Sequence, residues 1–216
     1  MIRSKSGIGI PTTLAEWCDP QHMALIVYDM QVGICRQIQG ADVAIERTAA
    51  VLQTARNAGM RIAFTRHLSL PRTWMGMTQL RTAMAWQHKA DPDAVESWFQ
   101  RDSAAMAIIP ELTPRPDEVV FDKITMSAFE STPLAFALRD CGIRAVALAG
   151  IAMEVGIEPT VRQATDNGFA AVLIEDACGF GKREARDRSL ATLTFIGEAI
   201  ITDAASFCAA VARPAS

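Results

Sequence analysis

Short, continuous runs of apolar residues alternate along the chain with stretches in which apolar residues recur at helical spacing. Such continuous runs are typical of strands that are buried on both faces of a sheet. They cover residues 23–28, 61–65, 118–122, 146–149, 170–174 and 199–201. The predicted helices cover residues 41–58, 133–141, 157–167, 182–196 and 203–212. This alternation predicts an α/β fold in which a parallel sheet carries helices on both faces.

Local signals mark the ends of two of these helices. Gly59 follows the helix predicted at 41–58, at a position where glycine commonly ends a helix. Thr132 is a predicted N-cap, and Pro133 stands at the first helical position, where its missing N–H is not needed. Residues 68–112 show no regular pattern, and we predict irregular structure there.

Composition and charge narrow the class of protein. The chain has 216 residues, of which 50% are hydrophobic and 21% are charged, and this suits one globular domain. We predict that residues 23–216 form this domain. Residues 1–22 lack the apolar core of a signal peptide, and we expect them to form an arm that lies on the domain or on a neighbouring subunit.

The charge, the apolar runs, the cysteines and the histidines argue against nucleic-acid binding, a membrane span, disulfide bonds and a metal site. The net charge of −3 offers no basic field for nucleic acid, and no apolar run approaches the ~20 residues of a membrane span. Five scattered cysteines argue against a disulfide framework and favour a cytoplasmic location. The three histidines lack the spacing of metal-binding motifs, so we expect neither a metal nor another cofactor.

Polar residues follow the ends of several predicted strands, namely Asp29, Arg66 with His67, and Lys123, while the turn 150–156 follows a fourth strand. The carboxyl ends of parallel strands meet at one edge, where such sheets bind ligands. A buried Asp29 needs a partner, and Lys123 is the natural one. Alternatively, Asp29 is a helix cap or part of a structural ion pair. Arg66 and His67 are interpreted as contacts for a substrate carboxylate or carbonyl, or simply as a polar loop start.

Four segments also carry motifs that are strong only in combination. They are Leu25–Gln31, Lys123–Leu134, Ala149–Thr160 and Asp176–Ala177. Together, in this order, they resemble the isochorismatase-like cysteine hydrolase family between about residues 23 and 207. The resemblance implies a three-layer α/β/α sandwich with a six-stranded parallel sheet in the order 3-2-1-4-5-6. It also implies a small-molecule substrate and a homo-oligomer.

The resemblance further implies a catalytic apparatus with one departure. Family members typically hydrolyse small amides with an Asp–Lys–Cys triad, in which the cysteine forms a thioester and backbone N–H groups hold the oxyanion. Asp29 and Lys123 match the first two members, but Gly156 stands at the nucleophile position. Glycine cannot form a thioester, and the true isochorismatases, which cleave a vinyl ether, are similar in having glycine there. A non-proline cis peptide is expected near Ala152 and Met153.

These observations leave three hypotheses. The first is acid-catalysed hydrolysis of a vinyl ether, in which Asp29 donates a proton, Lys123 orients Asp29 or binds a substrate carboxylate, and Gly156 leaves room for the reacting group. Backbone N–H groups around 155–157 would hold negative charge. The second is hydrolysis of a small amide or ester by water that Asp29 activates, and the third is a catalytically silent ligand-binding protein. The expected substrate contacts are Arg66, His67, Trp74, Trp86, Phe129, Met153, Val155 and Ile157.

Overall fold

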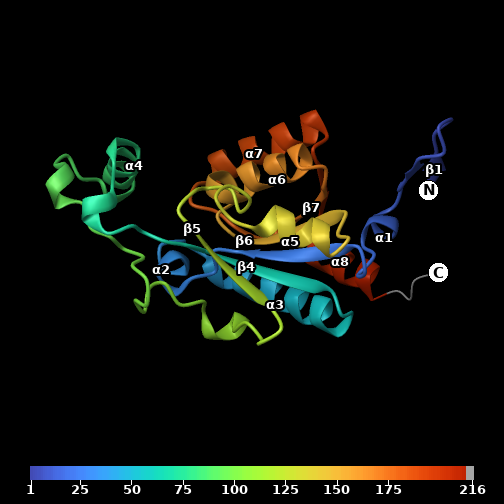
Figure 1. Ribbon diagram of the computed structural model, residues 1–216, viewed down its shortest axis with the longest axis horizontal. Coiled ribbons are helices and arrows are strands. Elements are labelled where there is room, and N and C mark those ends of the chain that lie inside the picture. Colours follow the sequence, from blue (N-terminus) through green and yellow to red (C-terminus); the bar gives the residue numbers. More distant parts are fainter. Residues whose placement is uncertain (213–216) are drawn as a thin grey trace.

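Six parallel strands form the central sheet of the protein, as seen in a computed structural model that describes residues 1–212 (Figure 1). The strand order across the sheet is β5-β4-β3-β6-β7-β8. Counted along the chain from the first sheet strand, this is the predicted order 3-2-1-4-5-6, which is therefore confirmed. The strands are β3 (Met23–Tyr28), β4 (Arg61–His67), β5 (Val119–Lys123), β6 (Ala145–Ile151), β7 (Ala170–Gly179) and β8 (Ala199–Thr202).

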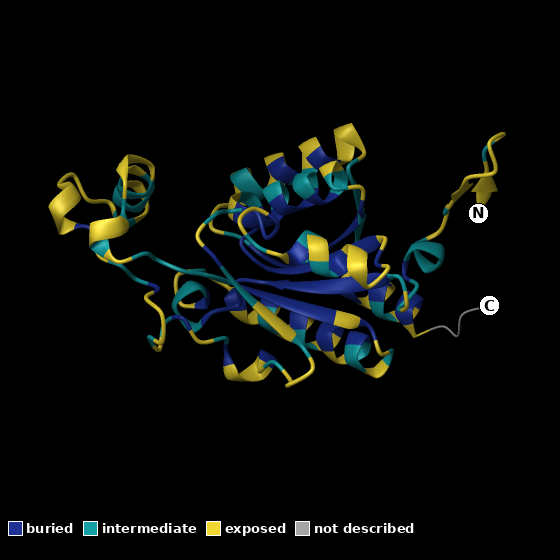
Figure 2. Ribbon diagram, in the orientation of Figure 1, coloured by how far each residue is buried: buried dark blue, intermediate teal, exposed yellow. Residues whose placement is uncertain are grey.

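Helices cover both faces of the sheet and make the expected three layers (Figure 1). One face carries α3 (Ala41–Asn57) and α8 (Ala204–Val211), and the other carries α5 (Leu134–Asp140), α6 (Glu158–Asp166) and α7 (Arg183–Ile196). The central strands β3 and β6 are entirely buried, whereas the edge strands β5 and β8 are partly exposed (Figure 2).

The central strand β3 shows why its apolar run is continuous. Leu25 and Val27 pack into the core on the α3 side, whereas Ala24, Ile26 and Tyr28 pack into the core on the α6 side. Successive side chains of a strand point to opposite faces, so a strand with a core on each face needs apolar residues at every position.

The region 68–112 contains a helix that we did not predict. It is α4 (Met77–Gln87), and it stands apart from the sheet, next to short turns of 3-10 helix at Arg72–Trp74 and Pro92–Ala94 (Figure 1). No residue of α4 is buried. Because the sequence signal for a helix is a buried apolar stripe, a helix without one escapes this kind of prediction.

The N-terminal segment lies outside the sheet. Strands β1 (Ile2–Arg3) and β2 (Gly9–Ile10) pair in an antiparallel ribbon that projects away from the body, and α1 (Leu14–Trp17) packs near α8 (Figure 1). Contact of this segment with a neighbouring subunit stays a prediction. Among residues 1–212, no helix combines the length and the apolar character that a membrane span requires.

The turn after β6 is irregular and lies close to the neighbouring strand. A cis peptide joins Ile151 to Ala152, one residue earlier than the resemblance implied. Gly150 has φ +134°, and a Cβ atom there would lie 2.1 Å from the backbone oxygen of Tyr28. Both the positive φ and the close approach of β3 therefore require glycine at position 150.

Candidate active site

Asp29 and Lys123 form an ion pair at the carboxyl edge of the sheet. Lys123 is the last residue of β5, and Asp29 directly follows β3. The Lys123 Nζ lies 2.7 Å from Asp29 Oδ2, and both side chains are buried. The pairing that was expected from the cost of burying a lone carboxylate is present.

Both oxygens of the Asp29 carboxylate accept hydrogen bonds. Oδ2 accepts from Lys123, and Oδ1 accepts at 2.7 Å from the hydroxyl of Thr65, which lies on the neighbouring strand β4. The backbone of Asp29 has φ +47°, in the left-handed region that Asp tolerates better than most residues. Both oxygens thus act as acceptors, which is the hydrogen-bonding role of a carboxylate.

Lys123 has no donor left for a substrate. An ammonium group carries three N–H donors, and Nζ directs hydrogen bonds to Asp29 Oδ2 at 2.7 Å, Tyr28 Oη at 2.8 Å and the Thr125 carbonyl at 3.1 Å. Burial lowers the pKa of Lys123, while the Asp29 carboxylate opposes that shift. Lys123 therefore positions the neighbouring groups, and the geometry does not favour the alternative in which it binds a substrate carboxylate.

Gly156 lies buried in the turn Met153–Ile157, which precedes α6. The N–H groups of Val155, Gly156 and Ile157 all donate to one acceptor, the Ala152 carbonyl, at 3.3, 3.1 and 3.2 Å. We expected these groups to hold negative charge on the substrate. In this structure they are already engaged, so that role would require them to leave the Ala152 carbonyl.

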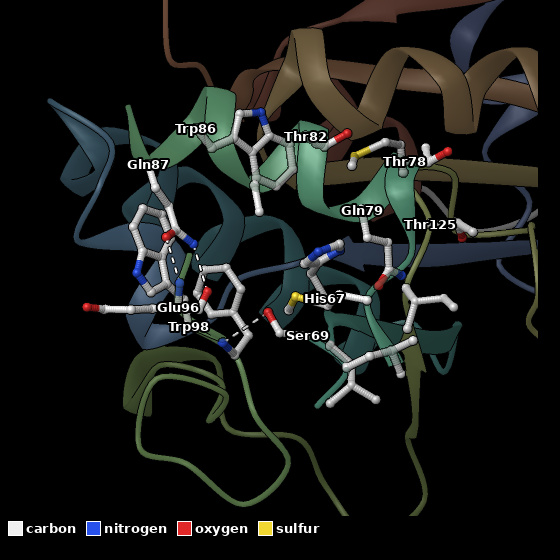
Figure 3. Close-up of a pocket in the computed structure, with 17 residues that line it drawn as sticks. His67, Ser69, Thr78, Gln79, Thr82, Trp86, Gln87, Glu96, Trp98 and Thr125 are labelled. Carbon is white, nitrogen blue, oxygen red and sulfur yellow. Dashed lines mark hydrogen bonds between the residues drawn. The ribbon is translucent and has the colours of Figure 1, made fainter. Parts of the chain in front are cut away.

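Two adjoining pockets, each of about 420 Å³, open at this edge of the sheet. Tyr28, Asp29, Ala152 and Val155 line one of them, which we call the catalytic pocket. The other lies under α4 and is lined by Gln79, Trp98 and neighbouring side chains (Figure 3). Four residues line both pockets, and they are His67, Trp86, Phe99 and Met126.

The structure brings only some of the predicted substrate contacts to these pockets. His67 and Trp86 line both, and Val155 lines the catalytic pocket. Arg66 instead forms an ion pair with Asp122 at 2.7 Å and lines neither pocket. Trp74 is 75% exposed and also lines neither. The contact roles predicted for Arg66 and Trp74 therefore lack support from the geometry.

Three other predicted contacts belong to the core. Met153 and Ile157 are fully buried on the α6 side of the sheet. Phe129 is also buried and stacks on Phe169, with ring centroids 5.8 Å apart. The structure therefore places these three side chains in the packing of the core, and it gives no support to the predicted substrate contacts.

Sequence analysis missed Tyr28 and Thr65, which both contact the ion pair. Two signals could have pointed to them. Tyr28 is the only aromatic residue in the strand β3, and the predicted strand order places β4, which carries Thr65, beside β3.

Among residues 1–212, no three metal-ligating side chains of His, Cys, Asp or Glu gather together.

His67 is predicted to make the stability of the protein depend on pH. Burial lowers the pKa of the His67 imidazole, and the nearby Asp29 and Lys123 act in opposite directions. As the pH falls below about 6.5, the unfolded chain binds a proton at His67 more readily than the folded protein, so the free energy of unfolding decreases. His67→Gln should reduce this decrease in urea unfolding between pH 7.5 and 5.5. The control is His88→Gln, which removes an exposed imidazole; an equal effect of both variants would contradict the prediction.

Comparisons with known proteins agree with this architecture. Residues 23–206 match the family described as "Isochorismatase domain". A ureidoacrylate amidohydrolase, RutB, from Enterobacter sp. (strain 638) is 28% identical over 212 residues, which cover 90% of this chain and 91% of that protein.

Solved structures share the fold. A cysteine hydrolase from Pseudomonas syringae pv. phaseolicola 1448A superposes with a TM-score of 0.76 at 21% identity, covering 94% of this chain and 98% of its own. A pyrazinamidase from Pyrococcus horikoshii superposes with a TM-score of 0.71 at 22% identity, covering 84% of this chain and 99% of its own.

Proposed function

We propose that this chain, which belongs to the isochorismatase family, hydrolyses an amide bond of a small molecule in its catalytic pocket. The observation that carries the proposal is the Asp29 carboxylate, which lines the pocket and accepts hydrogen bonds from Lys123 and Thr65 through both oxygens. A buried carboxylate held in this way is suited to act as a general base. The likeness to an amidohydrolase supports the choice of an amide.

The reaction uses water as the nucleophile, because Gly156 has no side chain. Asp29 takes a proton from the water while the water oxygen attacks the amide carbonyl carbon. The carbon–nitrogen bond then breaks, and the proton on Asp29 passes to the leaving nitrogen. Lys123 keeps Asp29 in place throughout and compensates for its charge. The products are a carboxylic acid and an amine or ammonia.

The pocket also restricts the substrate. A volume of about 420 Å³ is at the small end of the range for ligand sites, so the substrate is a small molecule. Trp86, Phe99 and Ile151 give the pocket an apolar wall on which a flat or apolar part of the substrate can pack.

The acid-catalysed cleavage of a vinyl ether stays a prediction, which the geometry does not favour. That reaction requires a proton on Asp29, whereas both of its oxygens accept hydrogen bonds from donors. The two mechanisms differ in their pH dependence. A general base loses rate as the pH falls, and a general acid gains rate.

Asp29→Asn is expected to lower kcat/KM for amide hydrolysis by about a thousandfold, because an amide cannot take the proton from water. Disappearance of ureidoacrylate and of pyrazinamide, followed by chromatography, measures the effect. The matched control is Arg66→Gln, which removes a charged side chain on the neighbouring strand that lines neither pocket and should leave turnover unchanged.

Two results would contradict the proposal. Full activity of Asp29→Asn would remove the general base. Absence of turnover in the unmodified protein, combined with an increase in its melting temperature in the presence of these amides, would instead point to a ligand-binding protein.

A further inference from the structure

The hydroxyl of Tyr28 fills the space beside Gly156. A Cβ atom on residue 156 would lie 1.9 Å from Tyr28 Oη and 2.3 Å from Tyr28 Cζ, and real atoms cannot approach so closely. A side chain at position 156 therefore requires the Tyr28 ring to leave its present position. Tyr28 Oη occupies the place to which a side chain at 156 would point, which is where the family resemblance placed a nucleophile.

Tyr28 Oη accepts one hydrogen bond and donates another. Lys123 Nζ donates to Oη at 2.8 Å and also lies 4.3 Å from the centre of the phenol ring. Because an ammonium group can only donate, the phenol proton is free to point elsewhere, and it is donated to the Met126 carbonyl. Accepting a hydrogen bond from a cation polarises the phenol and strengthens its own O–H as a donor.

The Tyr28 phenol is suited to donating a hydrogen bond and unsuited to attacking a substrate. Burial, and then the neighbouring Asp29 carboxylate, raise the pKa of Tyr28 well above its usual range. A phenol that keeps its proton is a weak nucleophile, but it can donate to an oxygen on which negative charge develops.

Lys182, His67 and Trp86 also offer donors to the catalytic pocket, but Tyr28 is the donor that lies beside both Gly156 and Lys123. The N–H groups of Val155, Gly156 and Ile157 converge on the Ala152 carbonyl, and the three protons of Lys123 have their own acceptors. The Tyr28 O–H also has an acceptor, the Met126 carbonyl, but a hydroxyl proton can rotate to another acceptor while a backbone N–H cannot. Tyr28 lines the pocket together with Asp29 and Ala152. Tyr28 and the general base thus line the same cavity.

We propose that Tyr28 is a further catalytic residue, whose hydroxyl takes the place of a side chain at position 156 and donates a hydrogen bond to the carbonyl oxygen of the substrate. The inference rests on the proposed amide hydrolysis. As water attacks the carbonyl carbon, the Tyr28 O–H turns from the Met126 carbonyl to the substrate oxygen. The proton stays on Oη, and no covalent bond to Tyr28 forms.

Tyr28→Phe tests the proposal, because it removes the hydroxyl and keeps the ring. We expect kcat for amide hydrolysis to fall about 100-fold, as when one donor to an oxyanion is removed, and KM to stay within threefold. A purely structural role would change KM and the melting temperature together with kcat. A kcat within threefold of the unmodified protein overturns the inference.

A binding measurement separates this inference from the proposed function. The probe is the phosphonamidate analogue of pyrazinamide, whose tetrahedral phosphorus and charged oxygen mimic the attacked carbonyl. The unmodified protein should bind it at least tenfold more tightly than Tyr28→Phe in calorimetry, even if no amide is turned over. Equal affinities, or no binding to either protein, overturn the inference. Absence of turnover alone contradicts only the proposed function.

The protonation state of Tyr28 can be read directly, because the chain contains one tyrosine. Phenolate absorbance near 295 nm therefore reports Tyr28 alone. We expect no phenolate signal from the folded protein at pH 9, and its appearance on unfolding at higher pH. A phenolate signal in the folded protein below pH 9 would show a charged nucleophile and overturn the role as donor.

Discussion

Lys123→Met is expected to lower the free energy of unfolding by about 3–5 kcal/mol at pH 7 and to abolish turnover. The large effect arises because the substitution leaves the charge of Asp29 buried without its cation. Methionine has nearly the shape of lysine, so lost packing contributes little. The measurement is urea unfolding at constant pH, together with the amide assays described above.

A double variant separates the charge effect from other causes. Asp29→Asn combined with Lys123→Met removes both charges, and replacing both members of a buried pair is often close to neutral. The double variant should therefore be clearly more stable than Lys123→Met, although equally inactive. Acidification should also reduce the deficit of the single variant, since a protonated carboxyl has no charge to bury. A double variant no more stable than Lys123→Met would disprove this explanation.

Gly150→Ala should destabilise the protein by more than about 3 kcal/mol. A residue with a side chain is strained at φ +134°, and strain of this kind costs about 1–3 kcal/mol. In addition, the new methyl group would lie 2.1 Å from the Tyr28 backbone oxygen, so that β3 and β6 must separate. Because Tyr28 precedes Asp29, we also expect turnover to fall. Urea unfolding and the amide assays measure the two effects.

Gly168→Ala is the matched control for this substitution. Gly168 also has a positive φ, +84°, but a Cβ atom there would meet no atom within 4 Å. Its cost should therefore be the conformational part alone, about 1–2 kcal/mol. The difference between the two variants isolates the close contact between the strands. Equal destabilisation by both would show that the sheet adjusts to the methyl group.

The fold could be predicted from the sequence wherever a buried element has a recognisable pattern of apolar residues. Strand β3 is buried on both faces, and its unbroken apolar run shows this directly. The helix α4 could not be predicted, because none of its residues is buried and its pattern carries no stripe. Strand β7 extends to Gly179, five residues beyond the predicted end, since the run from Glu175 onward includes polar residues.

The candidate site was predictable in part for the same kind of reason. Asp29 and Lys123 both stand at the ends of apolar strands. Because an unpaired buried charge is energetically costly, the sequence predicts that they form the ion pair that the structure shows. The proposed role of Tyr28 could not be predicted in this way. It depends on the absence of a side chain at Gly156, which lies in the turn after β6. Arg66 lies at the same sheet edge, but its charge is compensated by Asp122, which sequence proximity does not reveal.

The clash between the present position of Tyr28 and a side chain at position 156 restricts how these positions can change during evolution. A substitution of Gly156 on the present background places an atom on the phenol, whereas shortening Tyr28 first only opens a cavity. A lineage that exchanges this arrangement for a cysteine at 156 is therefore expected to change position 28 first. The fitness effect of a substitution at one position depends on the residue at the other, so the two sites are epistatic and should covary among homologues.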